Sequence, residues 1–418
     1  MKLIKIALKS ALNRKVSLSL AIFSIAISIL LLLGVDILRK QAKNNFLNTI
    51  SKTDLIVGAR SGPTNLLLYS IFHIGNATNN VSYESYKDII SNKKVKWSVP
   101  ISLGDSHKGF RVMGTNSDYF KYYKYADSQK LKFKDGVPFS GVYDAVVGND
   151  VAESLGYKIG SEIILSHGMT ATKYGEHRDK PFRIVGILEK TGTPVDRSVM
   201  VTLQGIEAIH IDWQSGTRSS FRISAEDALK MGLEPKNITA FMLGLNNKID
   251  IFRLKRDIND YNKEPLLAIM PGATLAYLWQ TIGGFEKVLI AISALVLLAG
   301  LIGLLIALLT TLNERRREMA VLRAVGAHAY HILMLFVLEA MLVVILGCSF
   351  GVGLVYILQI IIEPIVAEYY GIHLQIQFLD TMQMALLGIA LVLAILLSLI
   401  PGFIAYKRSL QDGLMVKV

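Results

Sequence analysis

Residues that could catalyse a reaction or bind a cofactor follow no recognised motif in this sequence. There is no G-x-x-x-x-G-K-[ST] loop to hold nucleotide phosphates, and the patterns H-E-x-x-H and G-x-S-x-G are also absent. Histidines occur at His73, His107, His167, His177, His210, His328, His331 and His373. Several share one long polar segment and could converge on a metal, but their spacing does not indicate a site. We favour surface or capping roles and predict no catalytic, cofactor-binding or metal-binding residues.

One short segment, residues 313–330, has charged residues with a more informative spacing. It reads NERRREMAVLRAVGAHAY and lies between two long apolar runs, residues 288–312 and 332–362. Each run is long enough to cross a bilayer, since about 20 residues span a hydrocarbon core of roughly 30 Å. The segment is therefore expected at a membrane surface, and its arginines predict the cytoplasmic side. Those arginines are Arg315, Arg316, Arg317 and Arg323.

The same segment has the pattern of a docking helix. Apolar residues share one helical face, and basic residues cover most of the rest. The apolar face has Met319, Leu322, and then Val325 or Gly326, with Val321 beside it. A simple topology anchor would need neither the acids Glu314 and Glu318 nor an apolar stripe that a partner's groove could accept. We therefore favour a partner-docking helix, with Gly326 as its stop.

The composition indicates an integral membrane protein with a large polar part. Of 418 residues, 52% are apolar and 19% are charged, which is less charge than the roughly 25% of soluble domains. Much of the net charge of +12 flanks the apolar runs. Membrane orientation and anionic lipid head groups explain it, so nucleic-acid binding is not expected. The single cysteine, Cys348, lies inside an apolar run, so no intramolecular disulfide can form.

Four apolar runs organise the chain. The expected spans are residues 16–37, 285–312, 331–362 and 381–402. Alternation then gives cytoplasmic segments at residues 1–15, 313–330 and 403–418, and outer segments at residues 38–284 and 363–380. Arg39, Lys40 and Lys287 lie outside against the charge trend, but the inner flanks carry far more positive charge. We expect Pro364 to end the third span and Pro401 the fourth.

The start of the chain allows two interpretations. Residues 1–15 are basic, lack acids and have apolar residues at helical spacing, which predicts an amphipathic helix on the inner leaflet. A signal peptide would have a shorter apolar core, about 7–15 residues, and a small-x-small cleavage site. Here the run continues into Asp36 and Lys40 without such a site. An uncleaved first span is therefore favoured.

Residues 38–284 are predicted to form an α+β domain with stalk helices at 38–50 and 273–286. Short β-rich pieces bounded by turn residues are expected at 54–57, 109–113, 145–147, 162–165 and 182–188. Helical stretches are expected at 83–90, 150–155, 225–230 and 249–261. Two lobes are expected, with a split guessed near residues 196–213.

The third span contains two features that suggest helix packing. Gly347 and Gly351 form a small-xxx-small pair, which lets helices approach closely within one chain or at a dimer seam. Glu339 lies about two turns into the span. For this acid we favour a structural, interfacial role within reach of Arg323.

The ordered set of motifs resembles the FtsX/MacB-type permeases of ABC transporters, the class called mechanotransmission or type VII systems. The matching motifs are ERRREM at 314–319, RAVGA at 323–327, LEA at 338–340 and PGFIAYK at 401–407. In the outer segment, residues 112–120, 146–149 and 184–188 are similar to the core-domain signature of that family. The resemblance covers nearly the whole chain, in the expected order. It implies a bacterial inner-membrane protein with both termini in the cytoplasm.

The resemblance also implies partners. Residues 313–330 would be a coupling helix seated in a cleft of a separate cytoplasmic ABC ATPase dimer, which would use the ATP. The permease would pair with a second copy or a paralogue, and a periplasmic adaptor, lipoprotein or hydrolase could work with it. The sequence departs from the macrolide-exporter type in having no fused nucleotide-binding domain. It departs from the division-protein type in its larger outer domain.

These features predict a permease subunit that couples ATP hydrolysis by a partner to movement of its periplasmic domain. The movement would export or release a peptide, an amphiphile or a lipoprotein. The alternative is a non-transporting signalling or scaffold subunit that activates a periplasmic enzyme. A membrane-bound enzyme is disfavoured, because no nucleophile–base or metal-ligand spacing stands out.

Overall fold

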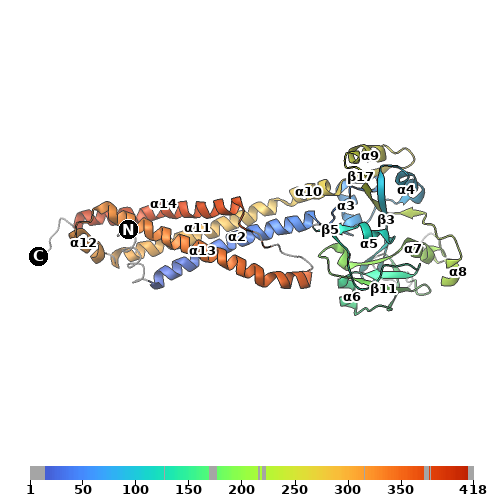
Figure 1. The fold of residues 1–418 in the computed structure, drawn as a ribbon, viewed down its shortest axis with the longest axis horizontal. Coiled ribbons are helices and arrows are strands. Elements are labelled where there is room, and N and C mark those ends of the chain that lie inside the picture. Colours follow the sequence, from blue (N-terminus) through green and yellow to red (C-terminus); the bar gives the residue numbers. More distant parts are fainter. Residues whose placement is uncertain are drawn as a thin grey trace. The chain divides into compact units, whose positions relative to one another are not determined.

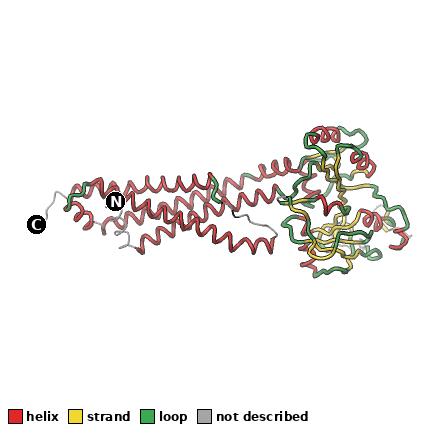
Figure 2. Tube along the Cα trace, viewed as in Figure 1, coloured by secondary structure: helices red, strands yellow, loops and turns green. Residues whose placement is uncertain are grey.

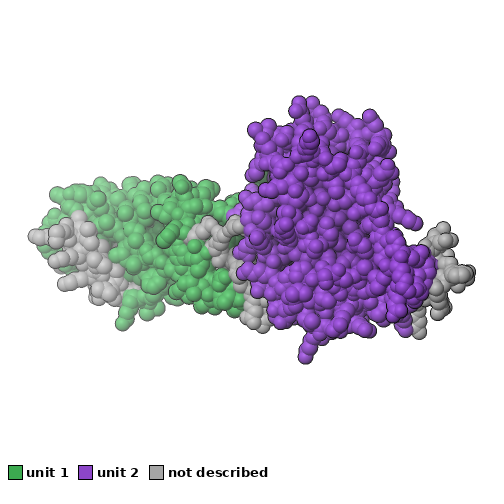
Figure 3. All heavy atoms as spheres, turned by 45° about the vertical axis from the view of Figure 1, so that its right-hand side comes forward, with its two compact units in different colours: residues 1–42, 282–365, 373–418 green, residues 43–281, 366–372 purple. Residues whose placement is uncertain are grey.

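The chain folds into two compact units. The computed structural model describes residues 15–126, 128–168, 177–214, 217–218, 223–314, 316–370, 376 and 378–412. One unit comprises residues 1–42, 282–365 and 373–418, and the other comprises residues 43–281 and 366–372 (Figure 3). Figure 2 shows that the strands belong to the second of these units, while long helices make up the first.

The first unit, which we call the membrane unit, consists mainly of long helices (Figure 1). They are α2 (Lys15–Leu47), α11 (Gly284–Glu314), α13 (Ala329–Tyr370) and α14 (Thr381–Asp412), with the short α12 (Arg316–Ala324) between α11 and α13. Each of the four long helices contains a stretch long and apolar enough to cross a membrane. Helices suit this environment because they satisfy every backbone N–H and C=O group within the segment. The predicted four-span architecture is confirmed.

Two helix ends differ from the prediction. Neither Pro364 nor Pro401 ends its helix, since α13 continues to Tyr370 and α14 to Asp412. A proline removes one backbone hydrogen bond, but helices in membranes tolerate this where their neighbours support them. Pro401 is buried, and a Cβ atom added at Gly402 would lie 3.4 Å from Cγ of Leu333. Packing of α14 on α13 therefore outweighs the local helix-breaking preference.

Helix α2 packs closely against two neighbours. A Cβ atom added at Gly347 would lie 2.6 Å from Cγ2 of Ile25, and one added at Gly351 would lie 2.8 Å from Cβ of Ile29. On α11, a Cβ atom at Gly300 would lie 2.4 Å from Oγ of Ser28. Only hydrogen fits at these contacts, so the glycines bring the helix backbones together. The Gly347/Gly351 pair thus packs within one chain.

The other unit is built around an eleven-stranded mixed sheet, ordered β17-β1-β16-β3-β4-β12-β8-β11-β7, with β10 beside β3 and β9 beside β11. The strands are β1 (Leu55–Ala59), β3 (Val95–His107), β4 (Phe110–Thr115), β7 (Phe133–Gly136), β8 (Asp144–Val147), β9 (Glu162–Ile163), β10 (Ser166–His167), β11 (Phe182–Leu188), β12 (Ser198–Thr202), β16 (Ala240–Leu245) and β17 (Leu266–Ile269). The helices are α3 (Pro63–Ile71), α4 (Tyr83–Ile90), α5 (Asp118–Tyr122), α6 (Asn149–Leu155), α7 (Leu203–His210), α8 (Ala225–Leu229), α9 (Asp250–Asn259) and α10 (Pro271–Ile282), with a 3-10 turn at Pro194–Arg197. The predicted α+β class is confirmed.

Strand β3 joins two lobes. Its first half pairs with β16, where Val99 faces Met242, and its second half pairs with β4, where Leu103 faces Met113. The first lobe contains β17, β1 and β16, and the chain between β3 and β16 forms the second lobe. The split guessed near residues 196–213 stays a prediction; that stretch contains β12 and α7, and β12 pairs with β4 and β8 in the same sheet. The two lobes share strand β3, so no flexible linker joins them and the sequence has no linker-like stretch between them.

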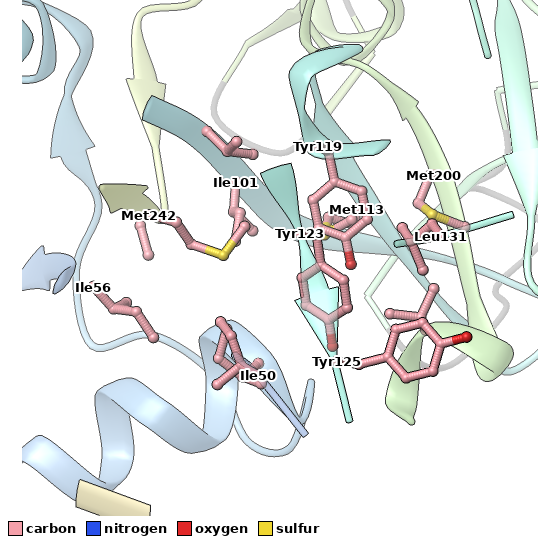
Figure 4. Packing of buried hydrophobic residues seen from close by; sticks show 14 of the residues in the cluster. Ile50, Ile56, Ile101, Met113, Tyr119, Tyr123, Tyr125, Leu131, Met200 and Met242 are labelled. Carbon is pink, nitrogen blue, oxygen red and sulfur yellow. The ribbon is translucent and has the colours of Figure 1, made fainter. Parts of the chain in front are cut away.

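A hydrophobic cluster lies across both lobes and ties the chain that follows α2 into the domain. Figure 4 shows Met113, Tyr123 and Met242 among its buried side chains. The hydroxyl of Tyr123 donates to the carbonyl of Thr49 at 2.9 Å, and the N–H of Ser51 donates to the carbonyl of Lys124 at 2.7 Å. The end of the first stalk is thus fixed by hydrogen bonds as well as by apolar packing.

The two predicted stalks are helical. The first is the end of α2, and the second is α10 followed directly by α11. Phe46 of α2 packs on Trp279 of α10 with ring centroids 5.4 Å apart, and Leu275 of α10 is fully buried. Aromatic pairs of this kind contribute about 0.5–1.5 kcal/mol beyond area burial. Both chain connections to the domain therefore pack together there.

The glycine contact of α13 can be tested with two matched substitutions. Gly351→Leu should lower the melting temperature of the detergent-solubilised protein, because the new side chain meets Ile29 and the carbonyl of Ala26. Overpacking of this kind costs about 1–3 kcal/mol. Gly353→Leu is the control, since nothing beyond the adjacent backbone of its own helix and its chain neighbours lies within 4 Å of its added Cβ. Equal melting temperatures for the two variants would contradict the proposed packing.

Candidate functional site

The segment between the second and third spans forms the short helix α12 and ends in a defined turn. The N–H of Ala327 donates to the carbonyl of Leu322, and that of Gly326 to the carbonyl of Arg323, both at 3.0 Å. Gly326 has φ +94°, a left-handed conformation that favours glycine. This is the Schellman arrangement, which satisfies the last carbonyls of a helix. The predicted helix stop at Gly326 is confirmed.

Helix α13 begins immediately after this turn. The N–H of His328 donates to Nδ1 of His331 at 3.0 Å, so a side chain caps the start of α13. Turn and cap together fix the path of the chain from α12 into the third span.

The faces of α12 differ from the prediction. Met319, expected to meet a partner, is only 7% exposed and packs with Leu312 and Phe336 in the core of the helix bundle. Val321 and Val325 are instead 63% and 84% exposed. Residues three or four apart share a helical face, so Met319 and the half-buried Leu322 lie on one side and the two valines on another. The spans themselves occupy the face that the sequence assigned to a partner.

The charged residues predicted to act in this segment fall into two groups. Arg323 and Glu318 are half-buried. Residue 315 and the side chains of its neighbours lie outside the part of the chain that the structure describes, so their predicted role stays a prediction. Those residues are Glu314, Arg315, Arg316 and Arg317. Glu339 is 3% exposed, within a largely buried stretch of α13 that includes Phe336 and Val343.

A charge network lies at the opposite end of the bundle from α12. Asp36 of α2, 9% exposed, accepts hydrogen bonds from Arg39 at 2.9 Å, Lys40 at 2.7 Å and Gln383 of α14 at 2.9 Å. Arg39 also pairs with Glu286 of α11 at 3.3 Å, and Lys40 pairs with Asp380. Arg39 and Lys40, which the charge rule left unexplained, are thus neutralised by acids from three segments. The spacing of Asp36, Arg39 and Lys40 was the sequence signal for this network.

The histidines of the β-rich unit are more buried than predicted. His107 is 3% exposed, and its ring bonds the carbonyl of Ile164 and the hydroxyl of Tyr157, both at 2.7 Å. His73 bonds Oγ of Ser198 at 2.9 Å. Burial, and then the charge of Arg111, lowers the pKa of His73 to about 4. The expected surface or capping role is therefore wrong for His107 and also for the fully buried His177.

Three histidines of this unit converge in space, although their spacing in the sequence does not indicate it. His167, His177 and His210 meet at Asp105, and one possible ligand atom from each of these four residues lies within 4.8 Å of the others. The residues come from different strands, a helix and a connecting segment. Proximity of this kind arises only from the fold, which is why the sequence analysis missed it.

Comparison with known proteins matches both parts of this architecture. A model of the MacB-like periplasmic core domain matches residues 18–259, and a model of the FtsX-like permease C-terminal domain matches residues 290–413. The chain belongs to the FtsX/MacB-type permeases of ABC transporters. The α+β part between α2 and α11 is thus the periplasmic domain of this family, and the four apolar helices fit an inner-membrane protein.

Individual relatives are distant and longer. The chain is 24% identical over 358 residues to the macrolide export ATP-binding/permease protein MacB of Wolinella succinogenes, covering 84% of this chain and 52% of the relative. It is 23% identical over 266 residues to the pyoverdine export ATP-binding/permease protein PvdT of Pseudomonas fluorescens, covering 62% and 36%. The periplasmic region of MacB from Actinobacillus actinomycetemcomitans aligns with 56% of this chain and 94% of its own, at 10% identity and a TM-score of 0.34. This permease spans about half the length of the curated relatives it matches.

The charge network predicts a specific dependence on Asp36. Asp36→Asn should lower the melting temperature of the detergent-solubilised protein, because it leaves Arg39 and Lys40 without their shared counter-ion. Loss of a charged hydrogen-bond partner costs about 1.5 kcal/mol here, because Arg39 and Lys40 are part-exposed and keep Glu286 and Asp380. Asp135→Asn, at an exposed position in β7, is the matched control and should melt like the natural protein. Equal destabilisation by the two changes would show that Asp36 holds no network together.

Proposed function

We propose that this chain is the permease subunit of an ABC transporter in which a separate cytoplasmic ATPase dimer drives movement of the periplasmic domain. Helix α12 is the proposed docking site for the ATPase, and the helices on either side carry the movement. The observation that carries the proposal is the arrangement of α12 and the turn after it. Met319 anchors the helix to the bundle, while Val321 of the helix and Val325 of the turn are exposed.

The chemistry of α12 supports docking to a protein. Two exposed valines one helical turn apart form a narrow apolar ridge, the form in which a helix enters a groove. The predicted arginines of the same segment would add charge at the rim of such an interface, where they favour correct orientation. The topology that follows from the positive-inside rule puts this ridge in the cytoplasm, where ATP is available.

The relatives support the choice of energy source. Their names join an ATP-binding part to a permease part, and the aligned region of this chain corresponds to about half of such a protein. We infer that the ATP-binding part acts as a partner subunit and that two permease subunits meet two ATPase subunits. Closure of the ATPase dimer on ATP would move the two α12 helices together.

The path of the movement follows covalent structure and packing. The turn at Gly326 and the cap at His331 join α12 to α13, and α13 is interlocked with α2 through Gly347 and Gly351. In the periplasmic domain the end of α2 packs on α10 through Phe46 and Trp279. The proposed cargo class is a peptide, an amphiphile or a lipoprotein at the outer face of the inner membrane.

The docking assignment is tested by charging the valine ridge. The double variant Val321→Glu/Val325→Glu should reduce co-purification of the ABC ATPase by at least about tenfold, since about 1.4 kcal/mol of lost binding energy produces that change. Basal folding should be unaffected, because both side chains are exposed. The measurement is the ATPase-to-permease ratio after affinity purification of the permease in detergent.

A matched control distinguishes docking from a general effect of added charge. Ile249→Glu/Phe252→Glu changes two exposed apolar residues beside and within α9, which are 81% and 69% exposed. This control should keep the full ATPase ratio. If the valine variant also keeps it, α12 is not the docking site. The alternative, a non-transporting signalling or scaffold subunit with the same architecture, is distinguished by an extrusion or lipoprotein-release assay in vesicles with and without ATP.

A further inference from the structure

Four possible metal ligands meet in the second lobe of the periplasmic domain. Oδ1 of Asp105 lies 3.2 Å from Nδ1 of His167 and 3.7 Å from Nε2 of His210, and these two ring nitrogens are 3.3 Å apart. His177 completes the group, with its ring centroid 4.7 Å from that of His167 and 5.3 Å from that of His210. All four ligand atoms lie within 4.8 Å of one another.

The fold builds this group at fixed positions. Asp105 near the end of β3 and His167 in β10 are directly opposite each other in an antiparallel ladder, so their side chains project from the same face. His210 ends α7, whose start is capped by Thr202. The N–H of His177 donates to the carbonyl of Leu165 at 2.9 Å, which fixes the fourth residue.

A buried ion pair next to the group, Lys180 with Asp212, supports the position of His177. The N–H of Lys180 donates to the carbonyl of His177 at 3.2 Å. The fully buried side chain of Lys180 pairs with Asp212 at 2.7 Å, and Asp212 is itself close to His210 in sequence. The segments that supply His177 and His210 are therefore joined by a buried ion pair.

The chemistry of the four side chains suits metal binding. Neutral imidazole and ionised carboxylate are the forms that bind metals. The group offers three imidazoles and one carboxylate, each with one possible ligand atom near the others.

The distances and donor types select a class of ion. Ligands about 2.0–2.1 Å from a tetrahedral ion lie roughly 3.3 Å from each other. The separations of 3.2, 3.3 and 3.7 Å among Asp105, His167 and His210 are close to this value. Three imidazoles with one carboxylate suit zinc and related transition metals, whereas calcium and magnesium prefer sets made of oxygen.

We propose that Asp105, His167, His177 and His210 form a binding site for a divalent transition-metal ion, with Zn²⁺ as the first choice, in the periplasmic domain. Asp105 and His177 form the buried side of the site, while His167 and His210 are partly exposed and leave a route for the ion. Because the ligands come from β3, β10, the segment before β11 and α7, the ion cross-links the second lobe. The site is independent of the proposed ATPase docking at α12.

The test uses the full-length permease in detergent, stripped with EDTA and then titrated with ZnCl₂. We expect one zinc ion per chain by elemental analysis and a rise of several degrees in melting temperature, since an ion that binds only the folded state stabilises it. The double variant His167→Gln/His210→Gln should bind Zn²⁺ at least about 100-fold more weakly. Both positions are partly exposed, so folding in EDTA should match that of the natural protein.

His107→Gln is the matched control. Its ring is bonded to Ile164 and Tyr157 instead of facing the group, so this variant should keep the zinc content and the zinc-dependent rise in melting temperature. Unchanged zinc affinity in the double variant would overturn the proposal. Absence of zinc binding by the natural protein at micromolar ZnCl₂ would overturn it too, and would leave a hydrogen-bonded histidine cluster.

Discussion

Strand β3 is the element on which the periplasmic domain depends. It pairs with β16 along its first half and with β4 along its second, so one strand carries the backbone hydrogen bonds of both lobes. Its pairing register with β4 shifts between Leu103 and Ser106, which is the kind of irregularity that re-aims a strand. Asp105 lies within this irregular stretch and faces His167 across the ladder to β10. The connection between the lobes and the group of metal ligands therefore depend on the same few residues.

Local patterns predicted most elements but not the one that organises them. Helix α4 begins and ends where expected, since Ser82 caps it and the apolar spacing is regular. All five predicted β-rich pieces overlap strands. β3 was missed because Pro100, Gly104 and Asp105 are poor strand formers, and only pairing on both sides stabilises a strand with such residues. At Pro364 of α13 and Pro401 of α14, packing likewise outweighs the local preference of proline to end a helix.

The functional surfaces were predictable in outline only. Sequence placed a helix and its stop between the second and third spans, but it could not tell which apolar residues the spans would cover. Met319, expected on the docking face, is buried in the bundle, whereas Val321 and Val325 are exposed. In the charge network, the spacing of Asp36 and Lys40 is visible in the sequence, whereas the contribution of Gln383 needs the bundle. The histidine group is the extreme case, since its members are far apart in the chain and share no motif.

The glycine contacts of α2 have a mechanical meaning. At Gly347 and Gly351 the side chains of Ile25 and Ile29 fill notches in the surface of α13, and at Gly300 Ser28 fills one in α11. A side chain seated in a notch has to be lifted out before its helix can slide by one residue, because the backbones leave no room around it. The close packing of α2 on α13 is therefore made by aliphatic side chains against a glycine-lined helix surface, which opposes sliding of one helix along the other.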